Sequence, residues 1–152
     1  MQDIDNEDIF SRLAQIHHDA FTPYGLRAWG VDEIRDLCHG NSELILSSCE
    51  GRPVGFALLH HLDITDIITL CVDPAFQGQG YAKQLVAKTI EAANIQACTA
   101  IILDVNAGNT LAQRLYKSFG FAHIHTRKDY YRSSYFCNQD AYIYHLYLQT
   151  AF

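Results

Sequence analysis

The segment from Leu70 to Lys83 places an apolar strand directly before a glycine-bearing turn, and the turn opens into an amphipathic helix. Its full sequence is Leu70-Cys71-Val72-Asp73-Pro74-Ala75-Phe76-Gln77-Gly78-Gln79-Gly80-Tyr81-Ala82-Lys83. Apolar residues recur at helical spacing after Gly80 and predict a helix over residues 80–94. A helix N-terminus presents unpaired N–H groups and a partial positive charge, and glycines let a phosphate approach the backbone closely. The segment therefore predicts an anion site and, first of all, a phosphate-bearing cofactor.

Two other interpretations of this turn stay open. In the first, the glycines only allow a tight turn between the strand and the helix. In the second, Gly78-Gln79-Gly80 belongs to a nucleotide-binding loop, but Lys83 lacks the Walker spacing and no third glycine follows. Nucleotide hydrolysis is therefore disfavoured.

The composition is that of one globular domain, which we expect to span residues 1–152. Of the 152 residues, 49% are hydrophobic and 18% are charged, and the formal net charge is -6. This composition argues against intrinsic disorder. The acidic balance disfavours nonspecific binding to nucleic acid and suits a basic partner or substrate.

The cysteines and the N-terminus predict a cytoplasmic protein. The five cysteines are odd in number, widely spread and without a CxxC motif, which is typical of free thiols in a reducing compartment. The N-terminus is acidic and lacks the basic and apolar regions of a secretion signal, and no apolar run reaches membrane-spanning length. We expect no membrane association, and a monomer or a weak dimer.

The spacing of apolar residues predicts helices and strands in the order α-α-β-β-β-α-β-α-β-β. The expected helices are one that begins at Asp5 or Asn6 and ends before Pro23, one over 31–38 ended by Gly40, one over 80–94, and one capped by Asn109 and ended by Gly120. The expected strands are 43–48, 54–61, 65–72, 100–105, 121–126 and 142–148, with a turn at 50–53 and a long loop at 127–140. This order predicts an α/β fold of the α+β type, in which one mixed sheet carries helices on both faces.

The turn Gln77-Gly78-Gln79-Gly80-Tyr81-Ala82 resembles the Gln/Arg-x-x-Gly-x-Gly/Ala signature of the GCN5-related N-acetyltransferase (GNAT) family. Matching segments precede and follow it at the spacing of that family: Val72-Asp73-Pro74, Asn109, Leu115-Tyr116 and Gly120-Phe121. The resemblance extends from Trp29 and Glu33 to Arg127-Lys128-Asp129-Tyr130-Tyr131 and Asp140-Ala141, toward the ribosomal-protein-alanine N-acetyltransferase (RimI-like) branch. It covers nearly the whole chain.

The resemblance implies a mostly antiparallel sheet whose central strands, around Val72 and Val105, splay apart to admit acetyl-CoA. It also implies cofactor contacts. The backbone N–H groups from Gln77 to Ala82 would hold the diphosphate, with Lys83 as a further phosphate contact. The backbone of Leu70, Cys71 and Val72 would pair with the pantetheine arm, and the Val72 N–H would polarise the thioester oxygen.

Asp104 closes an apolar strand where the family usually has Glu, the general base of the ribosomal branch. Because Asp is one methylene shorter, a water relay to the amine becomes more favourable than direct contact. The alternative is an Asp that accepts hydrogen bonds from N–H groups of the local turn. An α-amine with a pKa of about 7.7–8.0 is about one third neutral near pH 7.5, whereas a lysine side chain is about 0.1% neutral. The α-amine tolerates a weak base, which favours a protein N-terminus over a lysine as acceptor.

Tyr116 lies seven residues after Asn109, about two helical turns, so both side chains can face the same cofactor arm. The family uses the position of Tyr116 as the general acid that protonates the leaving thiolate. The alternative for Tyr116 is a core aromatic on an amphipathic helix. Asn109 suits an N-cap as well as a hydrogen bond to pantetheine.

Acceptor recognition is the least specified part of the site. The resemblance places Trp29, Arg127, Tyr130 and Tyr131 in substrate-facing loops, and aromatic packing over a sheet edge is the alternative. Several histidines occur in pairs, and His123 and His125 are expected to share one face of a strand. Since no Cys or carboxylate stands at matching spacing, no metal site is predicted.

The resemblance therefore predicts an N-acetyltransferase that moves an acetyl group from acetyl-CoA to the N-terminal α-amine of a protein, first of all an N-terminal alanine of a ribosomal protein. Two alternatives stay open. The acceptor is a small-molecule amine in the first. In the second, which the Asp104 departure motivates, the protein is a noncatalytic acetyl-CoA sensor that regulates a partner.

Overall fold

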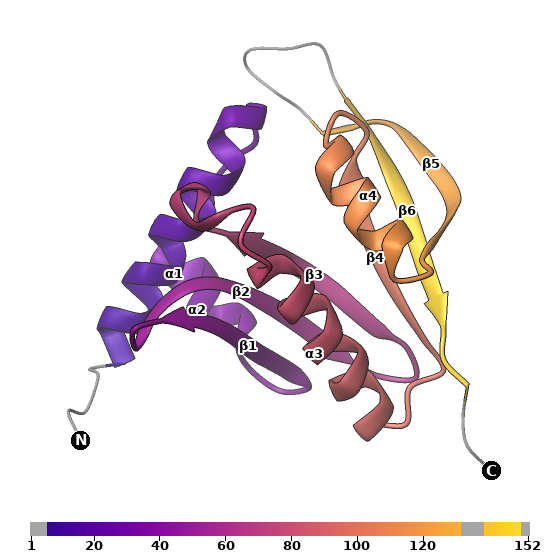
Figure 1. Cartoon of the computed structure of the whole chain (residues 1–152), viewed down its shortest axis with the longest axis horizontal. Coiled ribbons are helices and arrows are strands. Elements are labelled where there is room, and N and C mark those ends of the chain that lie inside the picture. Colours follow the sequence, from indigo (N-terminus) through magenta and orange to yellow (C-terminus); the bar gives the residue numbers. More distant parts are fainter. Residues whose placement is uncertain (1–5, 132–138, 150–152) are drawn as a thin grey trace.

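The computed structural model describes residues 6–131 and 139–149 (Figure 1). The helices are α1 (Asn6–Phe21), α2 (Val31–Leu37), α3 (Tyr81–Ile95) and α4 (Thr110–Ser118), with short 3-10 helices at Thr22–Tyr24 and Pro74–Phe76. The strands are β1 (Ser42–Cys49), β2 (Arg52–His61), β3 (Thr65–Val72), β4 (Ala100–Asn106), β5 (Ala122–Tyr131) and β6 (Gln139–Tyr147). No helix of the described residues is long and apolar enough to cross a membrane.

The strands form one six-stranded sheet in the order β1-β2-β3-β4-β6-β5. Among the described strands only β3 and β4 pair in parallel, from Thr65↔Ile101 to Ile67↔Leu103. Beyond this point the two central strands diverge (Figure 1). The predicted mixed, mostly antiparallel sheet with a splayed central pair is therefore confirmed.

A β-bulge lies on β3 where the pairing with β4 ends. Leu58 faces Thr69 and Leu59 faces Ile67, so Ile68 is an extra residue without a partner on β2. Because side chains alternate along a strand, the extra residue exchanges the two faces of β3. Ile67 accordingly packs with α3 and α4, whereas Cys71 packs with α1 and α2.

Helices cover both faces of the sheet, as the element order predicts. One face buries α1 and α2 through Leu13, Ile16 and Ile34, which pack on Phe56 of β2. The other face buries α3 and α4 in a larger cluster. Within the described residues, α1 and α2 contribute their core contacts to β1, β2 and β3, so the same face of β4, β6 and β5 stays open beside them.

The boundaries of the last two strands differ from the expectation. β5 continues to Tyr131 and β6 begins at Gln139, so residues 127–131 and 139–140 are strand rather than loop. The polar composition of this stretch is typical of a loop. Polar side chains are also compatible with a hairpin that has one face open to solvent. Residues 132–138 of the expected loop lie outside the described residues, as does Asp5, the other candidate for the start of α1.

Two smaller expectations were also wrong. The register shifts between His123 and His125, and this places the two side chains on opposite faces. The His123 ring consequently packs against Tyr142 and Tyr144. At the first hairpin, β2 already begins at Arg52, so the turn consists of Glu50 and Gly51, whose φ angles are 51° and 78°.

Candidate active site

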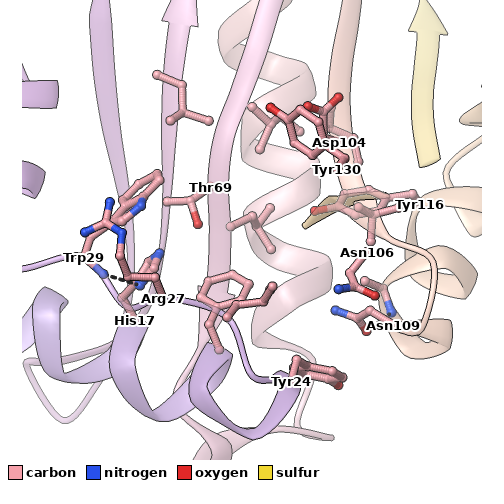
Figure 2. Close-up of a pocket in the computed structure, with 18 residues that line it drawn as sticks. His17, Tyr24, Arg27, Trp29, Thr69, Asp104, Asn106, Asn109, Tyr116 and Tyr130 are labelled. Carbon is pink, nitrogen blue, oxygen red and sulfur yellow. Dashed lines mark hydrogen bonds between the residues drawn. The ribbon is translucent and has the colours of Figure 1, made fainter. Parts of the chain in front are cut away.

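A pocket of about 330 Å³ lies where β3 and β4 diverge (Figure 2). Its wall combines residues from α1, the α1–α2 connector, β3, β4, α4 and β5. Six of the predicted site residues line it: Trp29, Leu70, Asp104, Asn109, Tyr116 and Tyr130. The splay thus brings predicted cofactor, catalytic and acceptor residues to one cavity.

The backbone of β3 offers hydrogen-bonding groups to this cavity. The Asp73 N–H donates to the Val54 carbonyl on β2 at 2.7 Å, and backbone groups alternate sides along a strand. The N–H groups of Leu70 and Val72 therefore point to the open side, whereas the N–H group of Cys71 points to β2. Of the three residues predicted to pair with a pantetheine arm, only Leu70 and Val72 have the required direction.

The glycine turn lies on the surface, outside the pocket. Gly78 and Gly80 have φ angles of 77° and 90°, and a Cβ at either would meet nothing within 4 Å. Within the described chain, no side chain caps the N-terminus of α3. Open backbone next to an uncapped helix start fits a phosphate.

Gln77 holds this turn in place rather than presenting its own amide. Its side chain donates to the Val72 carbonyl at 3.1 Å, and its N–H donates to the Pro74 carbonyl at 3.4 Å. The candidate hydrogen-bond donors to a phosphate are therefore the backbone N–H groups of residues 78–82 rather than those of residues 77–82. Lys83 is exposed beside them.

Asp104 lies at the open face of β4, next to a cationic and an aromatic side chain from β5. Arg127 approaches its carboxylate to 3.9 Å, and the same guanidinium lies over the ring of Tyr130 at 5.3 Å from its centroid. The Asp104 side chain is 33% exposed, and among the described residues it pairs with Arg127 and accepts no hydrogen bond from an amide of the local turn. Of Tyr131, only its place in β5 is described.

A second carboxyl group, which the sequence did not single out, accompanies Asp104. Asp66 on β3 pairs with Ile102, two residues before Asp104 on the neighbouring strand. Burial and the Asp104 charge raise the pKa of Asp66. The open face therefore carries negative charge close to the pocket, which suits a cationic amine.

On the other side of the pocket, Tyr116 and Asn109 come from α4 and its cap. Tyr116 is buried against Phe121 with a ring separation of 5.5 Å, and its hydroxyl points into the pocket (Figure 2). The predicted N-cap is confirmed, because the Asn109 Oδ1 accepts from the Ala112 N–H at 3.1 Å. Tyr116 is thus a core aromatic that also lines the pocket, and its role as general acid stays a prediction.

Asn106, which the sequence analysis missed, lies beside Asn109. Its Oδ1 accepts from the Gly108 N–H at 2.7 Å, while its buried Nδ2 has no acceptor within the described part of the chain. A buried amide donor without a partner is costly. Its position in the pocket wall fits a ligand that carries carbonyl groups.

The part of the wall that α1 forms contains His17. The sequence analysis missed this residue because its place in the pocket depends on tertiary packing. His17 stacks on Trp29 at 4.6 Å and accepts from the Trp29 backbone N–H through Nδ1 at 3.1 Å. Burial lowers the pKa of His17 to about 4, so the ring is neutral at physiological pH. The connector is held by a double ion pair between Arg27 and Glu33, with N–O distances of 2.7 and 2.8 Å.

A family model described as the acetyltransferase (GNAT) family matches residues 10–121. The [ribosomal protein bS18]-alanine N-acetyltransferase of Haemophilus ducreyi is 41% identical over 96 residues, which are 62% of this chain and 66% of that protein. The N-alpha-acetyltransferase RimI of Mycobacterium tuberculosis is 31% identical over 105 residues, which are 66% of this chain and 65% of that protein. The chain thus spans a little under two thirds of the length of these relatives.

Solved structures share the fold over nearly the whole chain. The ribosomal-protein-S18-alanine N-acetyltransferase of Escherichia coli superposes with a TM-score of 0.86 at 23% identity, over 99% of this chain and 94% of that one. A ribosomal-protein-alanine N-acetyltransferase from Brucella melitensis gives 0.82 at 19% identity, over 94% and 96%. With the family model matching most of its length, the chain belongs to the acetyltransferase (GNAT) family.

Proposed function

We propose that this protein transfers an acetyl group from acetyl-CoA to the α-amine of a protein N-terminus, first of all an N-terminal alanine of a ribosomal protein. The observation that carries the proposal is the open edge of β3, which joins the glycine turn to a pocket containing Asp104 and Tyr116. The names of the two relatives support the acceptor class. We place the reaction in the cytoplasm, where ribosomal proteins are available.

The chain's residues divide the binding of acetyl-CoA between them. The N–H groups of residues 78–82 and the Lys83 side chain face the diphosphate, and the backbone of Leu70 and Val72 pairs with the pantetheine arm. The side-chain amides of Asn106 and Asn109 contribute further donors. Acetyl-CoA supplies the thioester, and the Val72 N–H stabilises the negative charge that develops on its oxygen.

Asp104 and Tyr116 handle the protons. The ammonium loses a proton to the Asp104 carboxylate through water, and the neutral amine then attacks the thioester carbon. The carbon–sulfur bond breaks as the new amide forms, the Tyr116 hydroxyl gives its proton to the departing thiolate, and the attacking nitrogen releases its second proton to water. Exchange with solvent restores both side chains.

The acceptor assignment follows from the short carboxylate that the chain provides as a base. The Asp104 side chain is partly exposed and lies 3.9 Å from the Arg127 guanidinium, so the amine reaches it through water and has to be a group that gives up its proton readily. An α-amine with a pKa of about 7.7–8.0 needs little help to lose its proton, in contrast to a lysine at about 10.4. The N-terminal amine is therefore the acceptor that this site handles best.

The experiment incubates the protein with acetyl-CoA and ribosomal proteins, followed by intact-mass and N-terminal peptide analysis. We expect an acetylated alanine terminus, and no product from a peptide whose N-terminus is blocked. Tyr116→Phe and Asp104→Asn should lower kcat by about 100-fold while changing CoA affinity little. Acetylation confined to lysine side chains would overturn the acceptor assignment, and CoA binding without turnover would favour the sensor.

A further inference from the structure

His17 presents a fixed hydrogen-bond donor to the pocket. Its Nδ1 accepts from the Trp29 N–H, and in a neutral imidazole the proton must then lie on Nε2. No acceptor for Nε2 is present among the described residues, and the ring lies in the pocket wall. Stacking against Trp29 and packing against Phe21 keep the ring in this orientation. The donor is therefore preorganised.

Thr69 places a hydroxyl on the same side of the pocket. The bulge at Ile68 turns Thr69 toward the face that α1 covers, and the residue is 7% exposed. Figure 2 shows Thr69 and His17 on one side of the pocket and Tyr116, Asn106 and Asn109 on the other. Two polar side chains thus line the wall opposite Tyr116 and the two asparagines.

The charges around the pocket indicate which group of the acceptor fits beside His17 and Thr69. An N–H donor repels an ammonium and attracts a neutral oxygen, whereas the carboxylates of Asp66 and Asp104 attract the ammonium at the open face. A peptide N-terminus carries an amine and a carbonyl on the same carbon. A lysine side chain or a simple alkylamine lacks that carbonyl.

Building on the proposed function, we infer that the His17 Nε2–H and the Thr69 hydroxyl bind the carbonyl oxygen of the acceptor's first residue. His17 and Thr69 are therefore specificity residues that make the site selective for α-amino amides over amines without an adjacent carbonyl.

The test uses two amines with the same skeleton, L-alaninamide and isopropylamine, which differ in the carboxamide. The wild type should prefer L-alaninamide, and His17→Asn should reduce this preference about tenfold, the effect of one lost hydrogen bond. Asn keeps an acceptor for the Trp29 N–H but loses the donor. His17→Gln, which restores an N–H at the position of Nε2, should recover the preference, and Thr69→Val should reduce it in the same way as His17→Asn.

A binding measurement separates specificity from catalysis and folding. Calorimetry of L-alaninamide with the CoA-saturated protein should give a Kd about tenfold weaker for His17→Asn, while the Kd of CoA itself stays unchanged. An unchanged preference in both His17→Asn and Thr69→Val would overturn this inference and leave the proposed function intact. If the wild type acetylates neither amine and no peptide N-terminus, the proposed function fails and the inference fails with it.

Discussion

His17 should make the stability of the protein depend on pH in a defined window. The residue is 4% exposed, and its Nδ1 already accepts a hydrogen bond from the Trp29 N–H. A proton on Nδ1 would face that N–H and abolish the hydrogen bond. Burial is the main cause that lowers the pKa of His17 from 6.5 to about 4; the Glu33 charge opposes it and the Arg27 charge adds to it.

The sign follows from proton linkage. As the pH falls below 6.5, the unfolded chain takes up a proton at His17, while the folded protein does so only near pH 4. The folded state is therefore stabilised less and less across this window as the pH falls. At about 1.4 kcal/mol per pKa unit, the full shift corresponds to a loss of about 3 kcal/mol in the free energy of unfolding.

Urea denaturation of the wild type and of His17→Asn, from about pH 7.5 to about pH 4, measures this loss. Asn offers an oxygen to the Trp29 N–H and does not titrate, so the stability difference between the two proteins should shrink by about 2–3 kcal/mol toward low pH. His18→Asn is the matched control, because the adjacent His18 side chain is 60% exposed. Parallel stability curves for wild type and His17→Asn would refute the assignment of a buried, neutral His17.

Three further substitutions test the frame around the site. Gly55→Ala should destabilise the protein by about 1–3 kcal/mol in urea denaturation, because its Cβ would lie 3.0 Å from the Cys71 carbonyl oxygen and 3.1 Å from a Val72 methyl group; wild-type stability would contradict this packing. Arg12→Ala should cost about 3 kcal/mol by the same assay, since it leaves Asp73, 14% exposed, without its partner at 2.8 Å; a loss below about 1 kcal/mol would mean that water replaces the guanidinium. Gly80→Ala should weaken CoA binding in calorimetry, because Ala at a φ of 90° costs about 1–2 kcal/mol and puts a methyl group beside the proposed phosphate site; equal affinity would move that site elsewhere.

Much of the fold follows from local patterns in the sequence. The strand at 65–72, the helix after Gly80 and the cap at Asn109 lie where apolar spacing and capping chemistry predict them. These features depend on interactions between neighbours in the chain. The order of elements could be predicted for the same reason, whereas the splay was implied only by the family resemblance that the glycine turn carries.

The parts that local patterns missed depend on contacts between distant segments. His17 becomes a pocket residue only because the α1–α2 connector stacks Trp29 on it. Asp66 joins Asp104 only through the parallel pairing of β3 with β4. The polar stretch after Thr126 becomes a strand because β6 offers it backbone partners, which no feature of its own composition indicates.

The unpaired residue Ile68 is an insertion into β3 that has no counterpart on β2. Without it, Ile67 and Thr69 would be neighbours opposite Leu59 and Leu58, which are already neighbours on β2, so the pairing of β3 with β2 would continue without a break. Val72 would still face Gly55 with its amide on the open side, so a single deletion would remove the local bend at the point where β3 leaves β4 and keep the orientation of the edge beyond it.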